Sequence, residues 1–446
     1  MASRTERGLA GLSEELVERL FSFLEPRDLM ATALVSRAFS RIAGPLLYRT
    51  MVIGGTDGRG QKSIRALLDH PQHASSSVRE AVVYTSAAQL GALPLASTFT
   101  ARQQQTLGEW TPLHREHLSR YVDIVGRVVQ QMASLQTLEV RFLRHSDLQE
   151  LLRCVFRDYG RVSDPAKMFP KLATVRFRPV DIDEEDFVRL RLSTLAPVFR
   201  LPRLKHLEMQ NVEIVSDSLD DAELSPTPTV KTLTLRECPL RPHHVVALLQ
   251  ACPALESFDC EIMYDAEYAA STGPYDFSDI SDAIGTLSET LQYLRLIIIL
   301  FTTTAIDIGN PGPWGISSSI GRSLKTFKQL KRLQVSLPVL LGWHARGTAS
   351  LADVLPDSLE ELFVTQEPAY WDGYEWNDLD FSEEPGYVAV CTKIRDYIQD
   401  KPERLRKITI AVEDMEDQEA MVFTQDIADL AAKIGIEVEI LPERYA

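Results

Sequence analysis

The sequence comprises 446 residues, of which 45% are hydrophobic and 25% are charged, and it carries a formal net charge of −16. This balance is typical of a globular protein with a large core, while the negative charge argues against nucleic acid as a partner, since binding to phosphates requires a basic surface. The most apolar run, residues 294–301, is far too short to cross a bilayer, so no membrane partner is expected and the run is interpreted as a buried strand.

Residues 12–49 contain the densest helical signals of the chain. Ser13 is a favourable N-cap for a first helix, and Pro26 suits the first position of a second. A third helix is predicted over residues 35–42, and Gly44-Pro45 is expected to end it. Three helices in about forty residues cannot bury all of their apolar side chains among themselves. Some of these side chains therefore need a partner, which is either another protein or the domain that follows.

The same segment presents several residue types at a fixed order and spacing. These are Leu12, the run Glu14-Glu15-Leu16, Phe23-Leu24, Pro26, Asp28-Leu29, the run Leu34-Val35-Ser36-Arg37 and the ending Leu47-Tyr48-Arg49. In order and spacing they resemble the F-box motif, with two departures: Ser13 stands where the family commonly has Pro, and Phe39 where it usually has Trp. Ser13 still suits the cap of the first helix.

The resemblance implies a trihelical module that docks on a Skp-type adaptor, which in turn joins a cullin ubiquitin ligase. It also implies that no covalent chemistry occurs on this chain, because ubiquitin transfer belongs to other subunits. The apolar helix faces are the expected contact with the adaptor. The residues predicted to make it are Leu12, Leu16, Leu20, Phe23, Leu24, Pro26, Leu29 and Val35.

Residues 51–134 are predicted to form a linking segment and a first irregular repeat. Residues 78–84 indicate a strand, and residues 116–132 have the periodicity of an amphipathic helix. Residues 85–112 are polar with little periodicity and are interpreted as a surface loop.

From residue 135 onward the chain repeats an apolar line of the form LxxLx(L/V), with apolar variants, at intervals of 25 to 46 residues. Each line predicts a short strand whose alternate residues point inwards, and helix-like segments fill several gaps. One repeat cannot bury its apolar face alone, so neighbours must stack. The pattern is similar to an irregular leucine-rich-repeat array, although it lacks the Asn that usually follows the strand. The nine lines begin at Leu135, Leu172, Leu204, Val230, Leu255, Leu291, Leu330, Leu359 and Leu405.

We therefore predict an α/β fold, in which a short N-terminal trihelical F-box precedes an irregular leucine-rich-repeat solenoid with a curved parallel sheet and helices outside. The predicted domains are the F-box at residues 9–50, the linking segment at 51–134, and the solenoid with a C-terminal cap at 135–446. A general α/β domain without repeats is the alternative, and nine matching lines weigh against it.

Two parts of the predicted solenoid are candidates for binding a protein substrate. Outward-facing strand residues would form the concave surface, which is the usual binding face of such arrays. Tryptophans just beyond the later strands would lie on one rim, where aromatic residues are favoured interface anchors. The alternatives are a merely solvated face and tryptophans that cover the core. The candidates are Arg176, Arg178, Arg236 and Arg295 on the strands, and Trp343, Trp371 and Trp376 on the rim.

No catalytic constellation, cofactor motif or metal site is recognisable. His243-His244 lie near Cys238 and Cys252, but the spacing fits no common zinc site. The five cysteines form no CxxC pair and are odd in number, which indicates free thiols in a reducing compartment, the cytoplasm or the nucleus.

The function indicated is substrate recognition for an SCF-type cullin E3 ubiquitin ligase, with an unknown protein as the substrate. Two alternatives stay open: an F-box scaffold or regulatory protein that works outside a ligase, and an enzyme built on an unusual α/β domain. A deep polar pocket with clustered, perturbed titratable groups would favour the enzyme.

Overall fold

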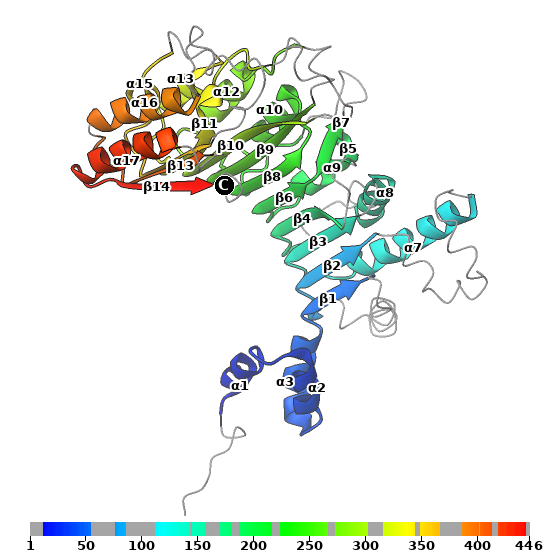
Figure 1. The fold of residues 1–446 in the computed structure, drawn as a ribbon. Helices are drawn as coiled ribbons and strands as arrows, with labels where there is room; N and C mark the ends of the chain where they lie inside the picture. The colour runs from blue at the N-terminus through cyan, green and yellow to red at the C-terminus, as the bar shows by residue number, and fades with distance from the viewer. Residues whose placement is uncertain are drawn as a thin grey trace, which may run out of the picture. The chain divides into compact units, whose positions relative to one another are not determined.

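The structure is a computed structural model that describes residues 12–54, 76–85, 112–142, 145–156, 169–180, 187–215, 224–265, 273–301, 315–343, 348–365, 386–400, 402–412 and 418–442. Figure 1 shows the ribbon of the chain. The chain divides into two compact units. One consists of Met1–Asp181 with Leu201–Arg203, and the other of Ile182–Arg200 with Leu204–Ala446. The predicted substrate residues Trp371 and Trp376, and the predicted loop at 86–111, lie outside the described residues.

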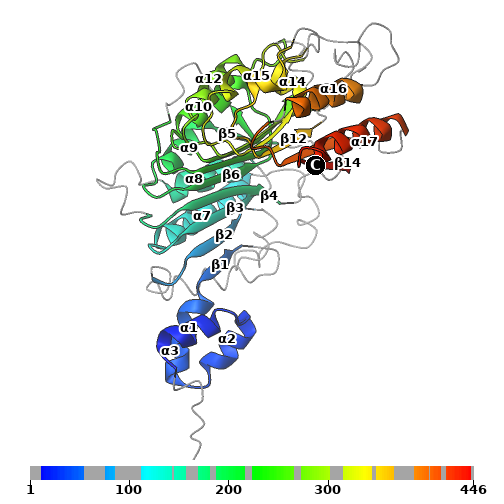
Figure 2. The same cartoon turned by 90° about the vertical axis from the view of Figure 1, so that its left-hand side faces the viewer.

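The first unit begins with three short helices, α1 (Glu14–Phe21), α2 (Pro26–Ala33) and α3 (Arg37–Leu47) (Figure 2). Ser13 and Pro26 occupy the predicted N-cap and first helical position. The helices enclose a small core, in which the rings of Phe21 and Phe39 meet edge to face with centroids 5.2 Å apart. The buried members of this core are Val17, Phe21, Leu29 and Ala43.

The prediction that Gly44-Pro45 ends the third helix is wrong, because α3 continues through Pro45 to Leu47. Proline disfavours a helical conformation of the preceding residue partly by a clash with its Cβ, and Gly44 has none. Leu46 and Leu47 also pack against the small core, so the extra turn adds apolar burial. Burial and the missing Cβ together offset the hydrogen bond that Pro45 cannot donate.

The first unit continues with parallel strands that pair in sequence order, and with the helices α7 and α8, which contact each other. The strands predicted at residues 78–84, 135–140 and 172–177 and the helix predicted at 116–132 are all present. The elements are β1 (Thr50–Ile53), β2 (Glu80–Tyr84), α7 (Pro112–Gln130), β3 (Thr137–Phe142), α8 (His145–Val155) and β4 (Thr174–Pro179).

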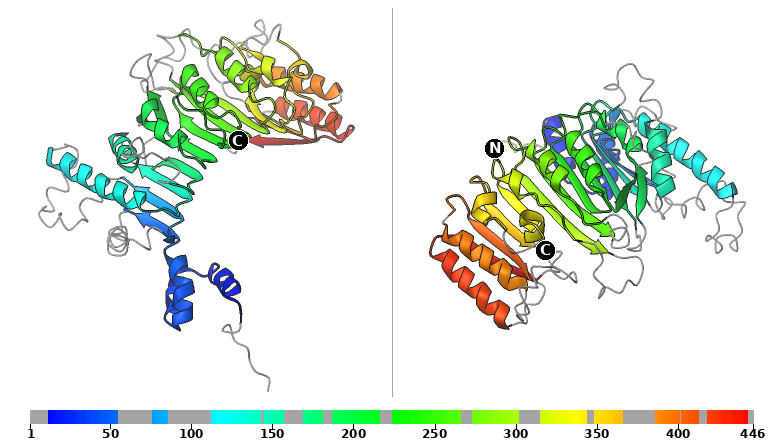
Figure 3. Two further views of the ribbon diagram at one scale, coloured as in Figure 1. Left: turned by 180° about the vertical axis from the view of Figure 1, so that it is seen from behind. Right: turned by 90° about the horizontal axis from the view of Figure 1, so that it is seen from above.

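The second unit contains a parallel sheet whose strands also follow the sequence order, with helices in the connections (Figure 3). The strands are β6 (His206–Gln210), β8 (Thr232–Cys238), β9 (Ser257–Asp265), β10 (Tyr293–Phe301), β11 (Arg332–Ser336), β12 (Glu361–Thr365), β13 (Lys407–Val412) and β14 (Glu437–Pro442). The helices are α9 (Leu192–Phe199), α10 (Pro242–Gln250), α12 (Ser278–Gly285), α13 (Gly321–Leu324), α14 (Leu337–Leu341), α15 (Leu351–Val354), α16 (Gly386–Gln399) and α17 (Gln418–Ala432).

Neighbouring strands pair so that equivalent positions of the repeated line lie next to each other. The second apolar residue of each line in the second unit is at most 1% exposed and pairs with its counterpart on the next strand. Ile408, in the last line, pairs with the half-buried Val438 of β14, which belongs to no predicted line. The predicted α/β solenoid, a parallel sheet built from successive strand and helix repeats, is thereby confirmed. These register partners are Leu207, Leu233, Phe258, Leu294, Leu333, Leu362, Ile408 and Val438.

A small second sheet was not predicted. It pairs β5 (Val188–Arg191) in parallel with β7 (Val212–Val215). The chain passes from β6 into β7 through Asn211, whose φ of 57° is left-handed, a conformation that asparagine tolerates better than most residues. The Asn211 N–H donates to the carbonyl of Arg236, and its own carbonyl accepts from Val188, so this single residue joins both sheets.

Candidate protein-interaction surfaces

Exposed apolar side chains are concentrated in residues 12–35, on the helices α1 and α2 and the segments beside them. Within the described part of the chain, nine large hydrophobic side chains are exposed, and seven of them belong to residues 12–35. Phe23 and Leu34 are the most exposed, at 79% and 87%. We call the seven residues the apolar surface: Leu12, Leu16, Leu20, Phe23, Met30, Leu34 and Val35.

The helix α1 explains how so short a segment exposes so much apolar area. Val17 and Phe21 are one helical turn apart and point into the small core. Leu16 and Leu20, also one turn apart, lie on an adjacent face and are exposed. A helix with apolar residues on two faces needs two partners, and the three-helix core provides only one of them.

The eight residues predicted to contact the adaptor differ in their exposure to solvent. Leu12, Leu16, Leu20, Phe23, Pro26 and Val35 are exposed, and Leu24 is half-buried against the core. Leu29 is only 5% exposed and lies within the core, so it stabilises the three helices and we leave it outside the apolar surface.

The sequence interpretation missed Met30 and Leu34, which are exposed members of the apolar surface. Neither residue was among the eight predicted to contact the adaptor. Leu34 is in fact the C-cap of α2, where the chain leaves the helix and its side chain leaves the core. The signal available in the sequence was the pair Leu34-Val35 immediately before Ser36, a strong N-cap.

Polar contacts hold the three helices in place around this surface. The Ser36 hydroxyl accepts a hydrogen bond of 3.1 Å from the backbone N–H of Phe39 and so caps α3. An ion pair joins Arg41 of α3 to Glu14 of α1. Ser13 occupies the N-cap position of α1, but its side chain makes no capping hydrogen bond.

Residues 14–54 match the family model described as F-box-like. The chain contains an F-box-like domain. The match covers α1, α2 and α3 and the strand β1, and therefore includes most of the apolar surface. No curated protein matches the sequence.

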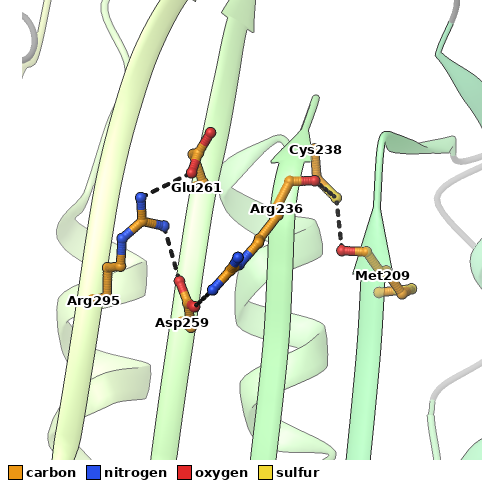
Figure 4. A network of polar contacts seen from close by, with 6 residues as sticks. All are labelled: Met209, Arg236, Cys238, Asp259, Glu261 and Arg295. Carbon is orange, nitrogen blue, oxygen red and sulfur yellow. Dashed lines mark hydrogen bonds and ion pairs between the residues drawn. The ribbon is translucent and has the colours of Figure 1, made fainter. Parts of the chain in front are cut away.

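On the sheet of the second unit, Arg295 and Arg236 are engaged in a polar network with two acids of β9 (Figure 4). The guanidinium of Arg295 donates to Asp259 at 3.0 Å and to Glu261 at 2.9 Å. Arg236 donates to the other carboxylate oxygen of Asp259 at 3.1 Å. The side chain of Arg295 is 14% exposed and that of Arg236 is 55% exposed. Arg236 is therefore the more accessible of the two to a partner.

The other two predicted arginines, Arg176 and Arg178, lie on β4 in the first unit and are half-buried. A second polar cluster lies in the same unit, on the neighbouring strands β2 and β3. Arg141 donates to Glu139 at 2.6 Å and to the hydroxyl of Tyr84 at 2.9 Å. Both clusters consist of outward-facing residues that neutralise each other within the chain.

Trp343, the one predicted rim tryptophan among the described residues, is buried. Its indole lies against Gly315, where a Cβ would come within 3.0 Å of the ring. Gly315 has a φ of 142°, so the chain combines a backbone conformation that favours glycine with a close approach to the ring. This burial corresponds to the alternative in which a tryptophan covers the core.

The described residues contain no group of three or more His, Cys, Asp and Glu side chains that is placed to hold a metal ion. His243 and His244 lie on α10 with ring centroids 4.1 Å apart. Burial raises the pKa of both Cys238 and Cys252 to about 12. Among the helices whose residues are described, none is both long and apolar enough to span a membrane.

Proposed function

We propose that this chain is the substrate-recognition subunit of an SCF-type cullin E3 ubiquitin ligase. The F-box-like domain docks on a Skp-type adaptor, and the repeat array binds a protein substrate. The observation that carries the proposal is the apolar surface, which lies on a domain that matches the F-box-like family and has no counterpart of similar density elsewhere in the described residues.

Burial of this surface supplies the free energy for docking. Complete burial of one large apolar side chain contributes roughly 1.5–3 kcal/mol. Seven side chains that are 42–87% exposed contribute on the order of 10 kcal/mol, the same order as the roughly 4–15 kcal/mol that association costs in lost freedom of motion, so docking needs most of them. The side chains also belong to short helices with a small core of their own, so the adaptor meets a preformed surface.

The sharpest test replaces two of the most exposed members of the apolar surface, Phe23→Asp and Leu34→Asp, and measures binding of the full chain to a purified Skp-type adaptor by calorimetry. We expect each variant to weaken binding at least tenfold. The matched control is Ile124→Asp on α7, since Ile124 is also a large exposed apolar residue but lies outside the domain. Adaptor binding equal to that of the unchanged chain in both variants would show that the docking surface is wrong.

A second measurement separates the ligase from the scaffold. The unchanged chain is purified from cells and probed for the adaptor and for a cullin. Recovery of both supports the ligase, and recovery of the adaptor without a cullin supports a scaffold or regulatory protein. Leu29 is not substituted in the adaptor-binding experiment, because a charge at this buried position would unfold the domain.

A further inference from the structure

Among the residues that the structure describes, β14 has no partner strand on one of its two sides, and we call this side the free edge. Within the part of the chain that the structure describes, β14 pairs only with β13, and it stands at the end of the strand order (Figure 1). Val438 and Ile440 of β14 are half-buried, whereas their register partners Ile408 and Ile410 on β13 are buried. Each inner strand of the order has a strand on both sides, whereas β14 has one among the described residues, in line with its partial burial.

The hydrogen-bonding groups of this edge can be assigned. The N–H of Glu437 donates to the carbonyl of Arg406 in the chain segment that leads into β13. Backbone groups of successive residues in a strand point to opposite sides, so the N–H groups of Val438 and Ile440 point to the free edge. An unpaired row of this kind is a template for an added strand.

Charges alternate in sign across the last four strands at one register position. Arg332, Glu361, Lys407 and Glu437 pair in that order on β11, β12, β13 and β14. Arg332 contacts Glu361 at 3.1 Å, and Lys407 lies 4.0 Å from Glu437 and 2.6 Å from Glu439. Opposite charges on neighbouring strands stabilise their pairing. The alternation ends on Glu437, whose side chain is 71% exposed, so a positive charge on an added strand would continue it.

We propose that the free edge of β14 binds an extended segment of the protein substrate in which basic residues alternate with apolar ones. The basic side chains meet Glu437 and Glu439, the apolar side chains cover Val438 and Ile440, and the peptide backbone pairs with the free edge. This inference names the substrate class of the proposed function and rests on it.

A second copy of this chain fits the edge poorly. In the antiparallel register that pairs residues 437–441 of the two copies, Glu439 faces Glu439, and like charges directly opposite are destabilising. The register that pairs residues 438–442 instead places Pro442, which has no N–H to donate, opposite Val438. The edge therefore favours a different, basic chain.

The test measures binding of fluorescein-labelled peptides to the purified full chain, without adaptor, by anisotropy. A peptide of alternating lysine and valine is compared with a peptide of the same composition in which lysines and valines form two separate blocks, and with one of alternating glutamate and valine. We expect the alternating lysine peptide to bind at least tenfold more tightly than either control. Equal binding of the two lysine peptides would reduce the effect to net charge and overturn the proposal.

Two variants test the edge itself. Val438→Pro removes an N–H that β13 does not use, and edge positions of this kind tolerate proline. Glu437→Lys reverses an exposed charge without touching the core. We expect Val438→Pro to weaken the lysine peptide at least tenfold and Glu437→Lys to shift the preference towards the glutamate peptide. Unchanged binding in Glu437→Lys would overturn the proposal even if Val438→Pro failed to fold.

The same preparations are assayed for adaptor binding. Loss of peptide binding in the β14 variants with adaptor binding retained supports two separate surfaces. Absence of peptide binding by the unchanged chain, with adaptor binding intact, would overturn the substrate class while leaving the adaptor docking in place.

Discussion

The ion pair between Arg295 on β10 and Asp259 on β9 joins neighbouring strands, with 3.0 Å between the guanidinium nitrogen and the carboxylate oxygen. The two side chains are 14% and 8% exposed, and Arg295 also binds Glu261. Few partners could compete for this guanidinium, because its withdrawal would leave Glu261 without this ion pair and Asp259 with Arg236 alone, which is costly at 14% and 8% exposure. Arg295 therefore supports the sheet itself, and its role in binding a substrate stays a prediction.

Replacing Arg295 by methionine is expected to lower the free energy of unfolding by about 3 kcal/mol, because Asp259 and Glu261 would remain buried without their main partner. Urea denaturation of the full chain measures the change. Arg236→Gln is the control, since Arg236 is more than half exposed and its pair with Asp259 contributes less than about 1 kcal/mol. Equal losses of unfolding free energy in the two variants would contradict the conclusion that Arg295 supports the sheet.

Gly126→Ala tests the contact between α7 and α8. A Cβ at Gly126 would lie 2.7 Å from the Cβ of Cys154 and 2.9 Å from its backbone carbon, so the helices would have to separate. We expect a loss of about 1–3 kcal/mol in the free energy of unfolding. At Gly285 in α12 the nearest atom is 3.4 Å away, and Gly285→Ala should instead gain up to about 1 kcal/mol from helix propensity. Thermal melting followed by circular dichroism distinguishes the two.

The two N-cap serines of the F-box-like domain are expected to differ. Ser36→Ala removes the hydrogen bond to the N–H of Phe39 and should cost about 1 kcal/mol of local stability. Ser13→Ala removes no capping hydrogen bond and should change stability by only a few tenths of a kcal/mol. Hydrogen exchange of the α3 and α1 amides reports each loss separately. Similar protection loss in both variants would indicate that the Ser13 side chain does cap its helix.

The buried thiols make stability depend on pH in the alkaline range. Burial raises the pKa of Cys238 from 9.0 to about 12, so the folded state favours the neutral thiol. The stability that this group contributes is complete below the unfolded-state value and is lost as the pH rises from about 9 towards about 12. Urea midpoints across this range should fall for the unchanged chain and fall less for Cys238→Ala.

Near neutral pH the same burial should make Cys238, Cys252 and Cys260 unreactive, since the thiolate is the reactive form. With a thiol reagent, these three should react only as fast as the protein unfolds, and all five cysteines should react at once in denaturant. Rapid labelling of any of the three in the native protein would contradict their burial.

Much of the fold was accessible from the sequence because each repeat carries its own periodicity. The lines that begin at Val230 and Leu291 predicted strands, and those strands pair in the expected register. The β5–β7 sheet was not predicted, because four-residue strands carry too few alternating positions. The left-handed Asn211 that separates β6 from β7 also has no unique sequence signal. The continuation of α3 through Pro45 was not predicted, because packing of Leu46 and Leu47 outweighs the tendency of proline to end a helix.

The interaction surfaces were predictable only in part. The surplus of apolar residues in 12–35 follows from composition, since a domain of about forty residues has too little interior to bury them. Which of them remain outside depends on how the helices pack. Leu29 and Leu34 lie five residues apart and are both leucine, yet one is in the core and the other is 87% exposed.

The sequence by itself determined the elements that depend on local periodicity: the three short helices, the repeated strands and their order, and the excess of apolar side chains near the N-terminus. Only the tertiary structure decided which side chains are accessible, because accessibility depends on neighbours far away in the chain. It paired Arg295 with Asp259, buried Trp343 against Gly315 and, among the described residues, gave β14 a partner strand on one side only.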